Sequence, residues 1–160
     1  MKCISLWQPW ASAIPLGLKQ IETRGWSTAV RGRIGIHAAK RWTKAERDFT
    51  AARRRAGDPF PDPLPLGAVV ATAVLHQVFT SEQLLPEVAD LELMYGDYGR
   101  GRFGWLLQEV VALEQPIEWA GKQGFFNVPD ELFPAAALAA PLRQQPGLWS
   151  FPVSAHEERT

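Results

Sequence analysis

The sequence predicts an α+β domain built on a small, mainly antiparallel β-barrel with flanking helices. Segments with strand character outnumber helical segments, and loops of variable length join them. The chain of 160 residues is long enough for one well-formed core and too short to favour two. We therefore expect one domain over residues 1–153, followed by a disordered tail over residues 154–160.

In the first part of the chain, the expected elements are a strand over 3–6, a helix over 9–17, an extended segment over 19–24, a strand over 31–39 and a helix over 43–57. Pro9 suits the first turn of a helix, and Gly17 suits a left-handed C-cap. Residues 31–39 alternate between apolar and other side chains with a period of two, as a strand does. Thr43 and Glu46 have the spacing of a capping box, which predicts where the longest helix begins.

In the second part, the expected elements are a proline-rich loop over 58–67, a strand over 67–79, a helix over 81–93 interrupted at Pro86, a glycine-rich loop over 94–102, and strands over 103–113, 123–128 and 147–153. Residues 67–79 are almost continuously apolar, which is typical of a strand covered on both faces. We predict that this is the central strand, and that the strand over 123–128 pairs with the strand over 103–113.

The composition excludes several classes of protein. The chain has no apolar run of about 18 residues and no signal-peptide pattern, so we expect a soluble, cytoplasmic protein without a membrane partner. Cys3 is the single cysteine and is expected to be buried and inert. The histidines, His37, His76 and His156, do not have the spacing of metal ligands, so we expect neither a metal nor another cofactor.

The net charge of zero conceals a strong segregation. Residues 1–57 hold twelve Lys or Arg against three Asp or Glu, a net charge of +9, while the remaining 103 residues hold five against fourteen, a net charge of −9. One interpretation is a basic surface that meets phosphate. The other is that the two parts interleave in space and attract each other. The sequence leaves both open.

A dense charged motif follows the Gly17 turn. In GLKQIETR, residues 17–24, Glu22 and Arg24 would share one face of an extended backbone and Lys19 the other, although alternation need not hold beside the turn. The motif could therefore converge at one barrel mouth, where the cations would meet a phosphate or base edge and Glu22 would orient them or accept a base amino hydrogen. The alternative is an ion pair of Glu22 with Arg24 or Lys19 that only closes the corner.

These residues carry a resemblance to a known family. The stretch over residues 5–40 resembles the ASCH (activating signal cointegrator homology) family, whose signature G-x-K-x-x-E-x-R is present as Gly17, Lys19, Glu22 and Arg24. The likeness covers roughly residues 3–128. It implies a β-barrel similar to the PUA domain, with a cleft beside the barrel that accepts RNA.

From the residues and the resemblance together, we expect an RNA-binding protein that recognises a single-stranded or modified nucleotide. Its partner would be RNA or a nucleoside-type small molecule, and the chain could be a monomer or a homodimer. Trp7 and Trp105 are expected to fill the core. The expected nucleic-acid-binding residues are Trp10, Lys19, Glu22, Arg24 and Trp26 around the cleft, His37 at a strand end, and Arg31, Arg33 and Lys40 along the RNA backbone.

Two enzymatic alternatives remain open. Some small bacterial relatives are amidohydrolases of N4-acetylcytidine that use the motif lysine, a threonine where this chain has Glu22, and a downstream glutamate. The resemblance would then make Lys19, Glu22 and Asp97 catalytic, with Glu92 as a second choice for the downstream acid. A metal-independent ribonuclease is the other alternative. The loop over 94–102 could also be a mobile lid that stacks Tyr95 or Tyr98 over the ligand.

Overall fold

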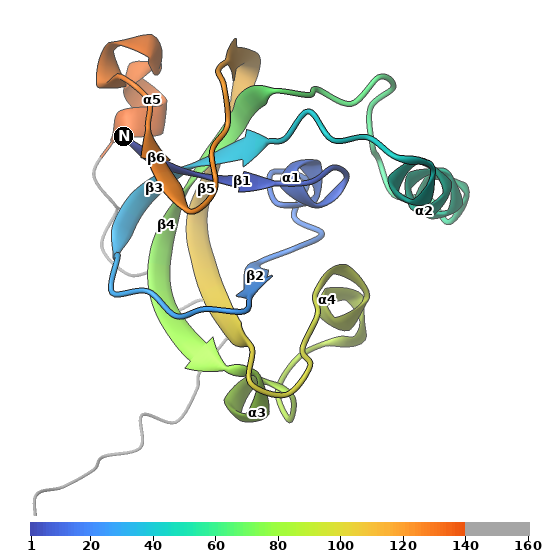
Figure 1. Ribbon diagram of the computed structural model, residues 1–160. Helices are drawn as coiled ribbons and strands as arrows, with labels where there is room; N and C mark the ends of the chain where they lie inside the picture. Colours follow the sequence, from blue (N-terminus) through green and yellow to red (C-terminus); the bar gives the residue numbers. More distant parts are fainter. Residues whose placement is uncertain (140–160) are drawn as a thin grey trace, which may run out of the picture.

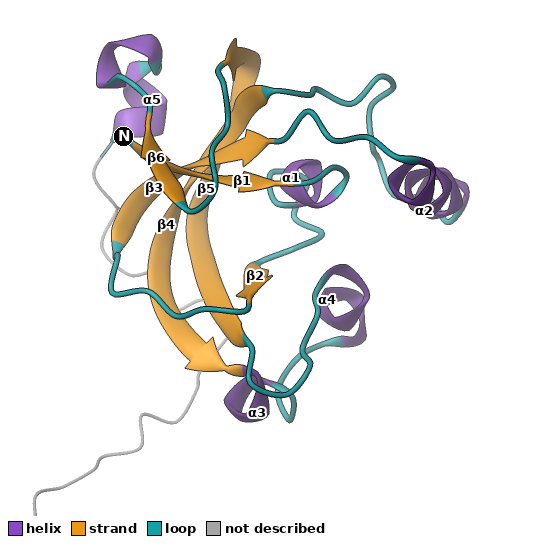
Figure 2. Cartoon of the chain, in the orientation of Figure 1, coloured by secondary structure: helices purple, strands orange, loops and turns teal. Residues whose placement is uncertain are grey.

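The computed structural model describes residues 1–139, and the expected strand over 147–153 and tail over 154–160 lie outside the described residues. The fold is α+β, as predicted, and its centre is one six-stranded, curled sheet in the order β2-β5-β4-β3-β1-β6 (Figure 1). Figure 2 shows the helices lying around this sheet, with loops of varied length between the elements. The curled sheet confirms the prediction of a barrel-like domain.

The strands are β1 (Lys2–Leu6), β2 (Ile21–Arg24), β3 (Gly32–Ala38), β4 (Ala68–Thr80), β5 (Phe103–Glu118) and β6 (Phe125–Asn127). Four neighbouring pairs are antiparallel, and β1 with β3 is parallel. The prediction that residues 123–128 pair with the strand starting at Phe103 is wrong, because β6 pairs with β1. Strand β5 has β4 on one side and β2 beside Phe103–Leu106 on the other, while β6 takes the free edge of β1.

The helices are α1 (Trp10–Ala13), α2 (Lys44–Arg55), α3 (Ser81–Leu84), α4 (Asp90–Tyr95) and α5 (Ala135–Leu138), with a 3₁₀ turn over Asp130–Leu132. Helix α1 is shorter than expected, and the chain turns after it through Gly17, whose φ is +74°. The capping box of Thr43 and Glu46 is present at the start of α2. The left-handed turn at Gly17 and the start of α2 therefore lie where the sequence predicts them, whereas α1 ends before Gly17.

The core lies against the interior strands of the sheet. The first eight residues of β4 are buried, which confirms it as the central strand. Trp105 of β5 is fully buried, as predicted, and stacks on Phe125 of β6 with 5.5 Å between ring centroids. Cys3 is also buried, and burial raises the pKa of its thiol to about 11, so the thiolate that would react is suppressed.

Some of the segregated charges meet across the fold. Arg33 lies 3.4 Å from the Glu109 carboxylate, and Arg53 lies 2.6 Å from Asp58. These contacts join cations of the basic part to acids of the acidic part. In residues 1–139, no helix is long and apolar enough to cross a membrane. The same residues contain no group of three or more His, Cys, Asp or Glu arranged to hold a metal ion.

Candidate functional site

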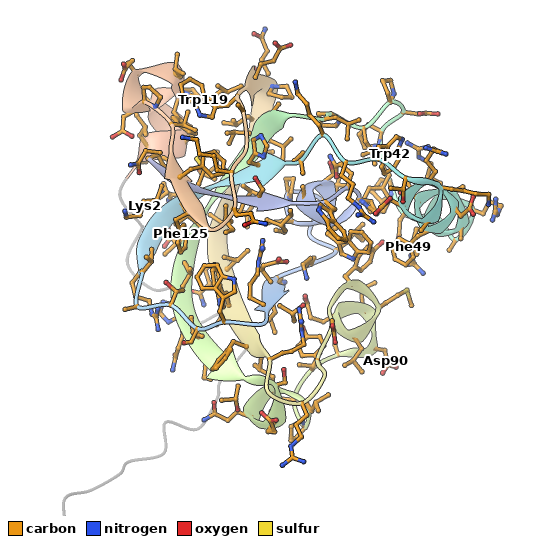
Figure 3. All side chains as sticks on the ribbon, viewed as in Figure 1. Lys2, Trp42, Phe49, Asp90, Trp119 and Phe125 are labelled. Carbon is orange, nitrogen blue, oxygen red and sulfur yellow. The ribbon has the colours of Figure 1, made fainter. Side chains whose placement is uncertain are left out.

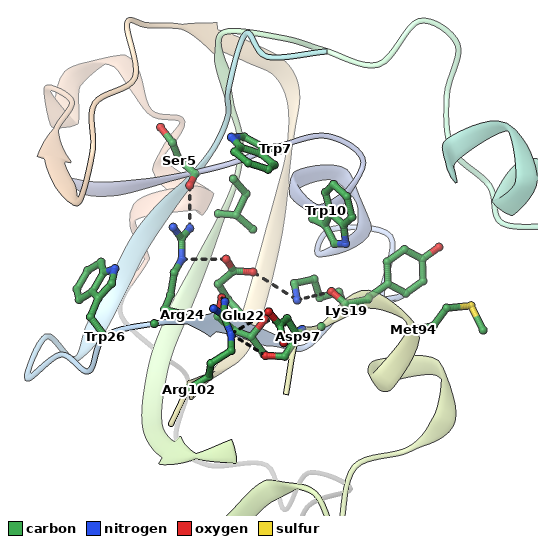
Figure 4. A pocket seen from close by; sticks show the side chains of 15 residues that line it. Ser5, Trp7, Trp10, Lys19, Glu22, Arg24, Trp26, Met94, Asp97 and Arg102 are labelled. Atoms are coloured by element: carbon green, nitrogen blue, oxygen red, sulfur yellow. Dashed lines mark hydrogen bonds and ion pairs between the residues drawn. The ribbon is translucent and has the colours of Figure 1, made fainter. Parts of the chain in front are cut away.

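A pocket of about 520 Å³ opens where the end of β1, helix α1, strand β2 and the segment after α4 meet (Figure 4). In the sheet, β1 is the neighbour of β3 and β2 is the neighbour of β5, so β1 and β2 lie toward opposite ends of the strand order. Because the sheet curls, β1 and β2 approach each other across its concave side. The lining residues are Ser5, Leu6, Trp7, Trp10, Lys19, Glu22, Thr23, Arg24, Gly25, Trp26, Met94, Tyr95, Gly96, Asp97 and Arg102.

The three charged residues of the signature converge in this pocket. The Glu22 carboxylate lies 3.3 Å from Lys19 Nζ through Oε2 and 2.9 Å from Arg24 Nε through Oε1 (Figure 4). The Arg24 contact is an ion pair without the alignment of a hydrogen bond. The residues thus form the ion pairs of one interpretation and share the single pocket that the other requires.

Lys19 is held more tightly than the sequence suggests. Its side chain is 1% exposed, and its ammonium donates to the carbonyl oxygens of Ile21 at 2.7 Å and Tyr95 at 2.8 Å. The Glu22 carboxylate, an ion-pair partner at 3.3 Å, is the third oxygen group around the ammonium. Lys19 therefore ties the pocket wall at Tyr95 to the turn that precedes β2.

Arg24 connects the two strands that face each other across the pocket. Its Nη2 donates to the Ser5 carbonyl oxygen of β1 at 2.7 Å. Its guanidinium also lies 5.9 Å from the centre of the Trp105 ring. The Arg24 side chain lines the pocket and keeps about a fifth of its surface exposed.

Asp97, the expected downstream acid, also lines the pocket. Its backbone N–H donates to Thr23 Oγ1 at 2.9 Å, and its carboxylate lies 3.3 Å from Arg102 Nε. Arg102 in turn donates to the Asp97 carbonyl oxygen at 3.0 Å. With Lys19 and Arg24, the pocket lining carries three cations and two carboxylates, a net charge of +1.

Glu92, the second choice for this acid, does not line the pocket. Its carboxylate is buried and accepts hydrogen bonds from the backbone N–H groups of Gln20 and Ile21, at distances of 2.8 to 3.0 Å. Burial raises the pKa of Glu92. The geometry gives this carboxylate a structural role, which is to hold the start of β2 against α4.

Trp10 and Trp26 line the pocket, as expected. Trp10 stacks on Phe49 with 5.5 Å between ring centroids. Figure 3 shows Phe49 beside α2. Trp26 packs edge-to-face with Trp105 at 4.7 Å. Both rings are therefore fixed by aromatic neighbours on one side while they border the pocket on another.

The prediction that Trp7 belongs to the core is wrong. Trp7 is 49% exposed, lines the pocket and carries the Arg41 guanidinium 3.8 Å from its ring centroid. Leu6 and Gln8, on either side of Trp7, are both buried, so Trp7 points away from the face that they share. The buried position goes instead to Gln8, which hydrogen-bonds Ser12. Pro9, two residues after Trp7, is the sequence signal that the strand has ended by this point.

Four expected site residues do not reach the pocket. His37 is buried, with its ring nitrogens 2.9 Å from Ser5 Oγ and 3.0 Å from the Trp119 carbonyl oxygen, and burial lowers its pKa. Arg33 Nε donates to the Ala139 carbonyl oxygen. The other two, Arg31 and Lys40, are exposed but are not part of the pocket lining. Strand β3 lies between β4 and β1, so its residues do not border the space between β1 and β2.

The tyrosines of the loop over 94–102 are both buried, which does not support a stacking lid. Tyr95 packs against Phe49 at 5.8 Å, and its hydroxyl donates to Asp58. Tyr98 packs in the cluster around Ile21, and burial raises the pKa of its hydroxyl.

The comparisons with known proteins agree with this fold and motif. The family model described as "ASCH domain" matches residues 4–121, so the chain belongs to the ASCH domain family. Activating signal cointegrator 1 from Homo sapiens and from Mus musculus are each 31% identical over 94 residues. This match covers 56% of the chain and 16% of each relative, so the chain spans only a small part of their length.

Solved structures are similar in fold. The crystal structure of ASCH from Zymomonas mobilis has a TM-score of 0.51 and 21% identity, and the match covers 81% of this chain and 88% of that one. A point mutant of the same bacterial protein has a TM-score of 0.51 and 20% identity, with coverages of 81% and 91%. At this identity, the likeness shows the fold.

Proposed function

We propose that the protein binds RNA and that the pocket between β1 and β2 holds one single-stranded or modified nucleotide. The observation that carries the proposal is the convergence of the charged motif with three indoles, Trp7, Trp10 and Trp26, on one pocket of about 520 Å³. This volume lies in the range of about 300 to 1,000 Å³ that is typical of small-ligand sites. Membership of the ASCH family supports RNA binding at the level of the family.

The contacts suggest a division of roles within the pocket. The Glu22 carboxylate is fixed by two cations and retains lone pairs for a base amino group. Arg24 and Arg102 are partly exposed and are the cations best placed to meet phosphate. Lys19 orients Glu22 and does not reach the ligand, since its ammonium is buried and fully engaged.

The same geometry favours binding over hydrolysis. Lys19, Glu22 and Asp97 do line one pocket, as the amidohydrolase alternative requires. A nucleophilic or basic lysine needs a free lone pair, however, and this ammonium is surrounded by three oxygen acceptors. We therefore place amidohydrolase and ribonuclease activity behind binding.

Titration of a short, fluorescently labelled single-stranded RNA tests the proposal. Affinity should fall several-fold between about 50 and 200 mM salt, because each cation–phosphate contact releases a counterion. A duplex of the same sequence should compete poorly, since its bases are not available to the pocket. Undetectable binding, or binding that does not respond to salt, would contradict the proposal.

Mass spectrometry distinguishes binding from turnover. The protein would be incubated with N4-acetylcytidine and, separately, with the RNA used in the titration. We expect both to be recovered unchanged. Free cytidine would favour the amidohydrolase, and shortened RNA would favour the ribonuclease.

A further inference from the structure

Trp7 and Arg41 form a stacked pair at the edge of the pocket. The Arg41 guanidinium lies 3.8 Å from the centre of the Trp7 ring, which is a close cation–π contact. Trp7 nevertheless remains 49% exposed and lines the pocket. The guanidinium covers only one face of the planar ring, so the exposed half of the Trp7 side chain includes indole surface that a ligand in the pocket can contact.

The structure also holds this pair in place. Arg41 Nε donates to the Glu46 carboxylate at 2.9 Å. Glu46 is buried, and its other oxygen closes the capping box at the start of α2 by accepting from the backbone N–H of Thr43 at 2.6 Å. The guanidinium is thus fixed by a helix terminus, and it restricts the indole that it covers. A ring restrained before binding loses less conformational freedom when a ligand stacks on it.

We propose that Trp7 is the surface on which the bound base stacks and that Arg41 is a positioning residue that holds Trp7 in the stacking orientation. This inference rests on the proposed RNA-binding function and adds to it a specific contact. An aromatic ring stacks on any base, so the contact supplies affinity without selecting sequence. Arg41 acts through Trp7 in this account and makes no contact with phosphate.

The other two indoles of the pocket are less suited to this role. Trp10 is half-buried and already has Phe49 stacked on it, with an angle of 17° between the rings. Trp26 is 39% exposed and packs edge-to-face with both Trp105 and Phe125. Trp7 is the most exposed of the three, and its ring is covered by a cation instead of by a second aromatic ring.

The test uses a short single-stranded RNA that carries an end label and one 2-aminopurine, a fluorescent base whose emission is quenched when it stacks on an indole. Label anisotropy reports binding, and 2-aminopurine emission reports stacking. The variants are Trp7→Ala, Trp7→Phe and Arg41→Gln. Trp119→Phe is the control, because Trp119 is a partly buried tryptophan that does not line the pocket.

For Trp7→Ala, we expect roughly tenfold weaker binding or more and loss of the quenching. Trp7→Phe should retain most of the affinity, since a phenyl ring still stacks. Arg41→Gln should weaken binding several-fold and reduce the quenching, while the dependence of affinity on salt stays the same. A phosphate contact by Arg41 would instead make that dependence shallower, by about one unit of slope or slightly less.

Three outcomes would overturn the inference. Equal affinity and quenching in the wild type and Trp7→Ala, with both folded by circular dichroism, would exclude Trp7 as the stacking surface while leaving RNA binding intact. A shallower salt dependence in Arg41→Gln with unchanged quenching would assign Arg41 to phosphate. Absence of RNA binding by the wild type would remove both this inference and the proposed function.

Discussion

Lys19 Nζ lies 3.3 Å from Glu22 Oε2, in a position where the lysine side chain is almost completely buried. The ammonium also bonds two backbone carbonyls, one of them 76 residues away in sequence, at Tyr95. A buried cation with this many partners fixes the structure around it. The same residue therefore serves the fold and orients the carboxylate at the centre of the proposed binding site.

Lys19→Met should lower the free energy of unfolding by about 3 kcal/mol, because it leaves the Glu22 carboxylate short of a partner and two carbonyls unpaired. Urea denaturation measures this change. Lys122→Met, at an exposed lysine, is the control and should have little effect. A loss below about 1 kcal/mol in Lys19→Met would mean that the buried contacts contribute little to stability.

Glu22→Gln should reduce the discrimination between RNA bases. If the carboxylate accepts a base amino hydrogen, the wild type should bind oligocytidine more tightly than oligouridine by about 1 to 3 kcal/mol. An amide side chain can also donate, so the ratio of the two affinities should approach one. The ratio is informative even if the substitution lowers both affinities. An unchanged ratio would exclude Glu22 from base recognition.

Arg24→Gln should make the salt dependence of RNA binding shallower. Removing one cation–phosphate contact reduces the slope of log affinity against log salt concentration by about 0.7 to 1. Titrations at several salt concentrations give the slope. The matched control is Arg55→Gln at the end of α2, where the arginine is exposed and does not line the pocket. Equal slopes for Arg24→Gln and the wild type would contradict a phosphate contact.

Gly35→Ala should destabilise the sheet. A Cβ at this position would collide with Cys3 Sγ, since the two residues pair directly between β1 and β3. We expect a cost of about 1 to 3 kcal/mol from overpacking. In the double variant with Cys3→Ala the sulfur is absent, so the combined cost should be smaller than the sum of the single costs by about 0.5 kcal/mol or more. Strictly additive costs would mean that the sulfur is not the obstacle.

The start of α2 should lose stability in acid. The Thr43 hydroxyl, followed by Arg41, lowers the pKa of Glu46 from its ordinary 4.5 to about 2. The carboxylate therefore stabilises the fold fully above pH 4.5, and this contribution is lost as the pH falls toward 2.

Chemical denaturation of the wild type and Glu46→Gln at pH 7 and at low pH measures this effect. The variant should be less stable at pH 7, and the difference should shrink in acid. Glu114→Gln, at an exposed glutamate of β5, is the control. A difference that stays constant with pH would contradict the assignment to Glu46.

Much of the fold follows from local patterns. The left-handed turn at Gly17 and the capping box of Thr43 and Glu46 lie where the sequence predicts them. Each depends on the conformations of a few consecutive residues, which the side chains there restrict directly. The pairing of β6 with β1 could not be predicted in this way, because strands of similar character compete for the same sheet edges.

The sequence by itself determined the family, the order of most strands and helices, and the charged motif, since each is written in residues close together along the chain. Only the tertiary structure decided that Trp7 faces the pocket, that the Tyr95 carbonyl oxygen accepts from the Lys19 ammonium, and that the Trp119 carbonyl oxygen lies 3.0 Å from His37 Nε2. Lys19 and Tyr95 are 76 positions apart in the sequence, and His37 and Trp119 are 82 positions apart. Side-chain exposure at such positions is set by which distant segments pack together, and local alternation carries no information about that choice.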